Sequence, residues 1–319
     1  MFALNAAAVC KKAASIVALA FLATLASPAP EAVASPPLPV PYGNLHAFGD
    51  VATHDWNGTV AGANDFACKP TAAHPNPVVL VGSTFLSDAV NWTAVAPYLH
   101  NAGYCVFTIS YGREMYYVPP GITGLDPMPR SAEQVADLVA KVRQATGAPK
   151  VDMVGHSQGG LVSRYFIEQL GGAPLVDKMV LLSSPYRATG LPIDVMAIAR
   201  QLIPQNVFDV IENNGLVPPL GVNFMDPYAF GRAADHLTPS IRYTLITDIA
   251  DEVGLYGGMA PPVGAPNAVT QYINQVCPTD FSQHFAQPYS PTAVAMIGNA
   301  LDPDHPVTAP CTFVPLYGL

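Results

Sequence analysis

The stretch from Lys150 to Gly171 constrains the fold more than any other part of the chain. It begins with the apolar run 151–154, which is typical of a buried strand. The pentapeptide GHSQG at 155–159 follows, and apolar residues then recur at helical spacing up to Leu170. A serine flanked by glycines between a strand and a helix predicts a sharp turn that exposes the serine hydroxyl.

The glycines have a steric role in such a turn. The strand and the helix approach each other closely, so side chains at Gly155 and Gly159 would collide with neighbouring elements. The turn forces the serine into a strained backbone conformation and aims the N-terminus of the helix at it. We therefore predict that Ser157 is a nucleophile, the alternative being a tight turn in an ordinary α/β protein.

Strand-like and helix-like segments alternate along the rest of the chain. Further strands are predicted at 77–81, 104–110, 178–184, 242–248 and 269–273, and further helices at 89–101, 131–147 and 292–301. The helix at 131–147 opens with Ser131–Gln134, which fits a capping box. This alternation predicts an α/β fold with a mostly parallel central sheet and helices on both faces.

The segment 190–240 is apolar, irregular and poor in charges. It is either a lid-like helical excursion that covers Ser157, or ordinary core helix.

The N-terminus has the pattern of a secretory signal. Lys11 and Lys12 precede an apolar run, and Ala-Val-Ala at 32–34 is a small-residue cleavage pattern. The apolar run is too short for a transmembrane span, although a membrane anchor is the alternative. We predict a signal peptide over 1–34, an extended arm over 35–63, a globular domain over 64–319, and secretion of the mature chain.

The charge of the chain excludes one class of function, and its cysteines indicate disulfide bonds. Only 12% of the 319 residues are charged and the net charge is −9, which argues against a nucleic-acid surface. Cleavage would leave Cys68, Cys105, Cys277 and Cys311, an even number that suggests two disulfides in an exported chain. Three pairings exist; we favour Cys68–Cys105 and Cys277–Cys311, because each pair brackets neighbouring elements. No Cys or His cluster indicates a metal, and no cofactor is expected.

A serine nucleophile needs a base within hydrogen-bond reach, and the base needs an orienting carboxylate. In an α/β-hydrolase sheet they follow in the order serine, acid, histidine, each on a loop after a strand. His284 lies between the last strand and the last helix and is the expected base, with His305 as the alternative. His156 is expected to be packed or hydrogen-bonded locally.

The acid and the oxyanion donors are less sharply defined. Asp248, Asp251 and Glu252 all follow a predicted strand, and position alone ranks Asp251 first without excluding the others. An oxyanion hole needs two backbone N–H donors, one from Gln158 and one from the loop after the strand at 77–81. Thr84 is our choice in that loop, where its hydroxyl would add a third donor.

Taken together, these motifs resemble the class 2 lipase family of secreted actinobacterial α/β-hydrolases and, more distantly, fungal lipase B-type enzymes. The motifs are NDF at 64–66, CKP at 68–70, HPNPVVLV at 74–81, NW at 91–92, NAGYCVF at 101–107, VGHSQGG at 154–160, DEV at 251–253 and CP at 277–278. The resemblance implies a carboxylic ester hydrolase acting on acylglycerols or similar lipid esters. For such a substrate, the lid-like segment 190–240 would line an acyl pocket, rest closed in water and open at a lipid surface. The resemblance also implies Ser157 as nucleophile, Asp251 as acid, His284 as base, and the two disulfides favoured above.

The chain departs from this family in one loop. Such lipases usually carry VHGTF, whereas residues 81–85 here read VGSTF, so that a serine replaces the glycine before Thr84. A backbone conformation open to glycine is denied to Ser83, which predicts altered oxyanion geometry. Two other functions remain: a polyester or cell-wall-ester hydrolase or acyltransferase on the same fold, and a non-catalytic binding protein, which only this altered loop favours.

Overall fold

A computed structural model describes residues 36–43, 59–113, 123–184, 186, 237–252, 261 and 264–316, and its elements lie in the unit formed by residues 37–319. The described strands form one six-stranded sheet in the order β2-β1-β3-β4-β5-β6. Every neighbouring pair in it is parallel. The predicted α/β architecture is therefore confirmed.

The strands are β1 (Val78–Val81), β2 (Val106–Ile109), β3 (Val151–His156), β4 (Val176–Leu182), β5 (Arg242–Thr247) and β6 (Ala268–Tyr272). The α-helices are α2 (Asp88–Asn91), α3 (Val95–Asn101), α4 (Met128–Thr146), α5 (Gln158–Gln169), α10 (Ile273–Val276) and α11 (Pro291–Leu301). Two short 3-10 helices, η1 (Ala173–Leu175) and η3 (Gln287–Tyr289), complete the described elements. Each strand overlaps a predicted segment, whereas the helix predicted at 89–101 divides into α2 and α3.

The predicted capping box at the start of α4 is wrong. The helix begins at Met128, one turn earlier than expected, and Pro129 lies in its first turn. Proline is tolerated there because the first N–H groups of a helix have no intrahelical acceptor. Ser131 consequently lies inside the helix, and its hydroxyl donates to the carbonyl of Asp126 at 3.3 Å.

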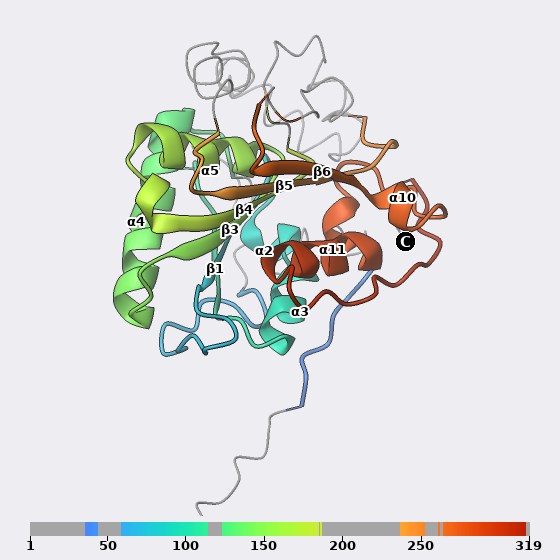
Figure 1. The fold of residues 1–319 in the computed structure, drawn as a ribbon, viewed down its shortest axis with the longest axis horizontal. Coiled ribbons are helices and arrows are strands. Elements are labelled where there is room, and N and C mark those ends of the chain that lie inside the picture. The colour runs from blue at the N-terminus through green and yellow to red at the C-terminus, as the bar shows by residue number, and fades with distance from the viewer. Residues whose placement is uncertain are drawn as a thin grey trace, which may run out of the picture. The chain divides into compact units, whose positions relative to one another are not determined.

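Helices cover both faces of the sheet, as Figure 1 shows. On one face, Val79 and Val81 of β1 pack in a cluster with apolar residues of α4 and α5. On the other face, Val78 and Leu80 of the same strand pack with residues of α3 and α11. Strands buried on both faces must be apolar along their whole length, which explains why the sequence reads as runs such as VVLV rather than as alternating residues.

The turn between β3 and α5 depends on close backbone contacts. A Cβ atom at Gly155 would overlap the backbone of Gly159 and Gly160, and one at Gly159 would overlap the carbonyl oxygens of Val81 and Gly82. The predicted steric role of the two glycines is thus confirmed, because side chains at these positions would separate β3 from α5 and α5 from the end of β1.

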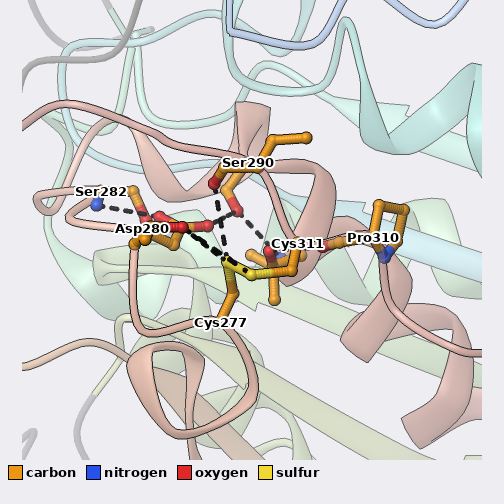
Figure 2. The surroundings of a disulfide bond; sticks show 10 residues. Cys277, Asp280, Ser282, Ser290, Pro310 and Cys311 are labelled. Atoms are coloured by element: carbon orange, nitrogen blue, oxygen red, sulfur yellow. Dashed lines mark hydrogen bonds between the residues drawn. A yellow bond between two sulfur atoms is a disulfide. The ribbon is translucent and has the colours of Figure 1, made fainter.

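The structure joins Cys68 to Cys105 and Cys277 to Cys311, the pairing favoured from the sequence. The second disulfide fixes the C-terminal tail to the segment that leads to His284. Figure 2 shows Asp280 beside this disulfide, where its carboxylate accepts hydrogen bonds from the N–H of Ser282 and the hydroxyl of Ser290. The tail also contacts this segment further along, because the carbonyl of Val314 accepts a hydrogen bond from the N–H of Phe281 at 2.9 Å.

The predicted signal peptide lies entirely outside the described residues, as do most of the extended arm and the lid-like excursion up to residue 236. They stay predictions, as do the domain limits. Among the helices that the structure describes, none is both long and apolar enough to cross a membrane.

The contacts at Gly159 give a test of the turn. Gly159→Ala should lower the free energy of unfolding by about 3 kcal/mol or more, because the new methyl group meets rigid backbone rather than a movable side chain. Gly171→Ala is the matched control: it has the strain of a left-handed φ of 76° but open space around it, so it should cost about 1 kcal/mol. Urea unfolding followed by circular dichroism compares them, and equal midpoints would refute the steric argument.

Candidate active site

Ser157 occupies the turn that the glycines make room for. Its backbone has φ 54° and ψ −124°, a conformation that costs a non-glycine residue about 1–3 kcal/mol. Two hydrogen bonds hold it there: its N–H donates to the carbonyl of Leu182 at 3.0 Å, and its carbonyl accepts from Gly160 at 3.1 Å. The serine is therefore fixed between the ends of β3 and β4, at the first turn of α5.

The structure brings Ser157, His284 and Asp251 together from three separate loops. The Nε2 atom of His284 lies 2.7 Å from the hydroxyl of Ser157, and its Nδ1 atom lies 2.9 Å from Oδ1 of Asp251. The side chains of His284 and Asp251 are almost completely buried. By contrast, the side chain of His305 is exposed, and its Nδ1 atom lies 3.1 Å from Oδ1 of Asp302.

The partners of His284 assign its tautomer. The carboxylate of Asp251 can only accept, so Nδ1 carries the proton and donates it. Nε2 is then unprotonated and accepts the hydrogen of the Ser157 hydroxyl. This is the arrangement that a general base needs in order to take a proton from a serine.

The second oxygen of Asp251 is held by residues that the sequence analysis did not identify. Oδ2 accepts from the hydroxyl of Ser183 at 2.6 Å, the hydroxyl of Thr247 at 3.2 Å and the amide of Gln287 at 3.2 Å. Hydrogen bonds of this kind stabilise the charged form of a carboxylate. Ser183 directly follows β4, and Thr247 is the last residue of β5. Polar residues at the carboxyl ends of buried strands were therefore the sequence feature that could have identified these two partners of Asp251.

The sequence left three candidates for the carboxylate that orients His284, and the structure gives each a different set of contacts. Asp248 shapes the turn: its Oδ1 accepts from the N–H of Ala250 at 2.8 Å and its carbonyl from the N–H of Asp251 at 3.1 Å. Glu252 accepts from the backbone N–H of His284 at 3.2 Å. Only Asp251 of the three reaches the imidazole ring of His284 in the described contacts.

Thr84 and Gln158 are neighbours, as an oxyanion hole requires. The N–H of Gln158 is the first of α5, where a helix leaves its N–H groups without intrahelical acceptors. Within the described residues, no acceptor is found for the N–H of Thr84. The Thr84 hydroxyl, however, donates to Oε1 of Gln158 at 2.8 Å, so in this state it braces the loop and does not serve as the third donor we expected.

The predicted oxyanion loop, residues 82–86, does not require glycine at position 83. In the described chain the positive φ of this loop falls on Phe85, at 68°, and Ser83 has an ordinary backbone conformation. The N–H of Ser83 donates to Oδ1 of Asn91 at 3.1 Å. The predicted strain at Ser83 is therefore wrong, and with it the one feature that favoured a non-catalytic protein.

A buried polar contact lies beneath this loop. The hydroxyl of Tyr111 donates to the carbonyl of Gly82 at 2.8 Å, and burial raises the pKa of the phenol well above its ordinary value. Gly124 packs so close that a Cβ atom there would lie 2.7 Å from Oε1 of Gln158 and 3.0 Å from Cα of Thr84. The spacing between the oxyanion loop and α5 is thus set by packing.

The sheet order and the serine turn define an α/β-hydrolase fold. The crystal structure of Aspergillus fumigatus lipase B is similar with a TM-score of 0.50 and 15% identity, over 79% of this chain and 56% of that one. At this identity the likeness shows the fold alone. Residues 75–189 match the family model described as lipase (class 2), which confirms the resemblance to that family over this segment.

Two curated proteins are similar to part of the chain. A triacylglycerol lipase of Burkholderia plantarii is 32% identical over 129 residues, which are 39% of this chain and 33% of that protein. A triacylglycerol lipase of Pseudarthrobacter phenanthrenivorans is 32% identical over 124 residues, 37% of this chain and 35% of that protein. The chain thus matches about a third of the length of each relative.

The environment of Asp248 predicts a pH-dependent stability. Burial raises its pKa to about 6, although the N–H of Ala250 opposes the shift. A carboxyl group with a raised pKa stabilises the fold when protonated, so this contribution is complete below about pH 4 and is lost as the pH rises through 6. Asp248→Asn keeps the acceptor for Ala250 and cannot ionise. Relative to the wild type, its urea midpoint should therefore rise between pH 4 and pH 7; a constant difference across this range would contradict the assignment.

Proposed function

We propose that the protein is a secreted carboxylic ester hydrolase, a lipase or esterase that cleaves acylglycerol-type lipid esters through an acyl-enzyme on Ser157. One observation carries the proposal: an unbroken series of hydrogen bonds runs from the Ser157 hydroxyl through both ring nitrogens of His284 to Asp251. The similarity of residues 75–189 to class 2 lipases supports lipid esters as the substrate class.

In the first half of the reaction, the Ser157 oxygen attacks the ester carbonyl carbon while Nε2 of His284 takes the hydroxyl proton. The imidazolium that forms donates to Asp251, whose charge is stabilised through Oδ2 by Ser183, Thr247 and Gln287. His284 then protonates the leaving alcohol as the carbon–oxygen bond to it breaks, and the acyl group remains on the serine.

In the second half, water attacks the acyl carbonyl and gives a proton to His284. His284 then returns this proton to the Ser157 oxygen as the bond between that oxygen and the acyl carbon breaks and the acid is released. Both tetrahedral intermediates carry a negative oxygen, which the N–H groups of Thr84 and Gln158 stabilise at the first turn of α5. An alcohol in place of water would give acyl transfer by the same route. The proposed steps need no cofactor.

Secretion rests on two features. The N-terminal pattern predicts cleavage after Ala34, and both disulfides are of the kind that persists in oxidising compartments. The predicted lid and its response to a lipid–water interface belong to this proposal, and a lipid or ester substrate is the proposed partner.

Ser157→Ala tests the reaction class directly. The wild type should hydrolyse p-nitrophenyl esters of graded chain length, and the variant should lose activity by about 10⁴-fold or more, because no other group replaces the attacking oxygen. A fluorophosphonate probe should label the wild type and not the variant. Hydrolysis or labelling that persists in Ser157→Ala would place the nucleophile elsewhere.

A pair of isosteric substitutions tests the choice of acid. Asp251→Asn should lower kcat by about 10⁴-fold, because an amide at this position favours the wrong tautomer of His284. Asp248→Asn should retain activity within about tenfold, since Asp248 shapes a turn and its Oδ1 acceptor is preserved. Steady-state kinetics on one soluble ester compares them. Equal losses in the two variants would remove Asp251 from its proposed role.

A further inference from the structure

His156, directly before the serine, has a role that the proposed reaction does not yet use. Its side chain is completely buried and contacts two acceptor oxygens. Nδ1 lies 2.8 Å from Oδ1 of Asn91, and Nε2 lies 3.0 Å from the backbone carbonyl oxygen of His284. Trp92 and Phe285 pack edge-on against the ring, with centroids 6.4 Å from it, so its orientation is fixed by packing.

These contacts join two parts of the site. Oδ1 of Asn91 also accepts from the N–H of Ser83, which directly precedes Thr84 in the oxyanion loop. A continuous path therefore runs from the backbone of Ser83 through Asn91 and His156 to the backbone of His284. The residue between the two loops is the neighbour of the nucleophile itself.

The two acceptors that face the His156 ring need two N–H donors, and a neutral ring has only one. Asn91 Oδ1 and the His284 carbonyl both accept, whereas a neutral imidazole has only one N–H to donate. Turning the Asn91 amide around would give His156 a donor, but would set the NH₂ group against the N–H of Ser83. A second proton on the ring is disfavoured, because burial and, to a smaller extent, the charge of a protonated His284 together lower the pKa of His156 to about 3.

We propose that His156 is a positioning residue that couples the oxyanion loop to the loop carrying His284, by sharing its single N–H proton between Asn91 and the main-chain carbonyl of His284. When the proton lies on Nε2 it holds the backbone of His284, and when it lies on Nδ1 it holds Asn91 and, through it, Ser83. The ring thereby links the position of the proposed oxyanion donors to the position of the proposed base. This inference rests on the proposed function for its kinetic consequence, but not for its proton count.

The kinetic test uses His156→Phe, which keeps the ring and removes both contacts. Its kcat should fall by about 10- to 100-fold with KM within about threefold, because small displacements of reacting groups act on the chemical step. His156→Gln, which restores one donor and one acceptor, should recover at least about fivefold of that loss. His74→Phe is the matched control, since His74 stacks on Tyr104 with centroids 3.9 Å apart, outside the described contacts of the site, and should keep wild-type kcat.

The second test needs no substrate. Two-bond ¹H–¹⁵N correlation spectra of the ¹⁵N-labelled protein at pH 7 should show a neutral His156 ring, and Asn91→Ala should move its proton toward Nε2 because the competing acceptor is gone. A doubly protonated ring, or a tautomer that ignores Asn91→Ala, would overturn the proposal, as would a wild-type kcat in His156→Phe. If the wild type hydrolyses no ester, the proposed function fails while the spectra still decide the role of His156. If His156→Phe does not fold, His156→Gln and the spectra decide.

Discussion

The site depends on the close contact between three pieces of backbone around the serine turn. Because Gly155 and Gly159 have no side chains, β3 and α5 can meet and the end of β1 can lie directly against α5. That contact presents Ser157 in a strained conformation and brings Thr84 beside Gln158. The proposed nucleophile and the proposed oxyanion donors are thus positioned by the same backbone contact, and the buried strands on either side of the turn hold the strained conformation in place.

His284 is held in a different way, through hydrogen bonds to each of its polar atoms. Its ring contacts Ser157 and Asp251, its backbone N–H contacts Glu252, and its carbonyl contacts His156. The disulfide Cys277–Cys311 and the C-terminal tail brace the segment that precedes it. A residue on a long loop loses considerable entropy when it is ordered, and these contacts offset that cost.

The parts of this arrangement that follow from local rules could be predicted. Buried strands read as apolar runs, and the turn at 155–159 needs glycines whatever the rest of the chain does. Parts that depend on contacts between distant segments could not. The sequence could rank Asp248, Asp251 and Glu252 only by position, and the geometry of the turn after β5 separates them. Ser83 appeared strained by analogy with a glycine in related chains, yet the positive φ falls two residues later, on Phe85.

The sequence by itself determined the parallel sheet with helices on both faces and the position of the serine turn, because periodicity and glycine spacing act over short stretches. The even number of cysteines indicated two disulfides. Only the tertiary structure decided which carboxylate meets His284, where the hydroxyl of Thr84 points, and that His156 connects two loops. These features depend on where side chains from separate strands meet at one edge of the sheet, and burial there requires each polar group to find a partner.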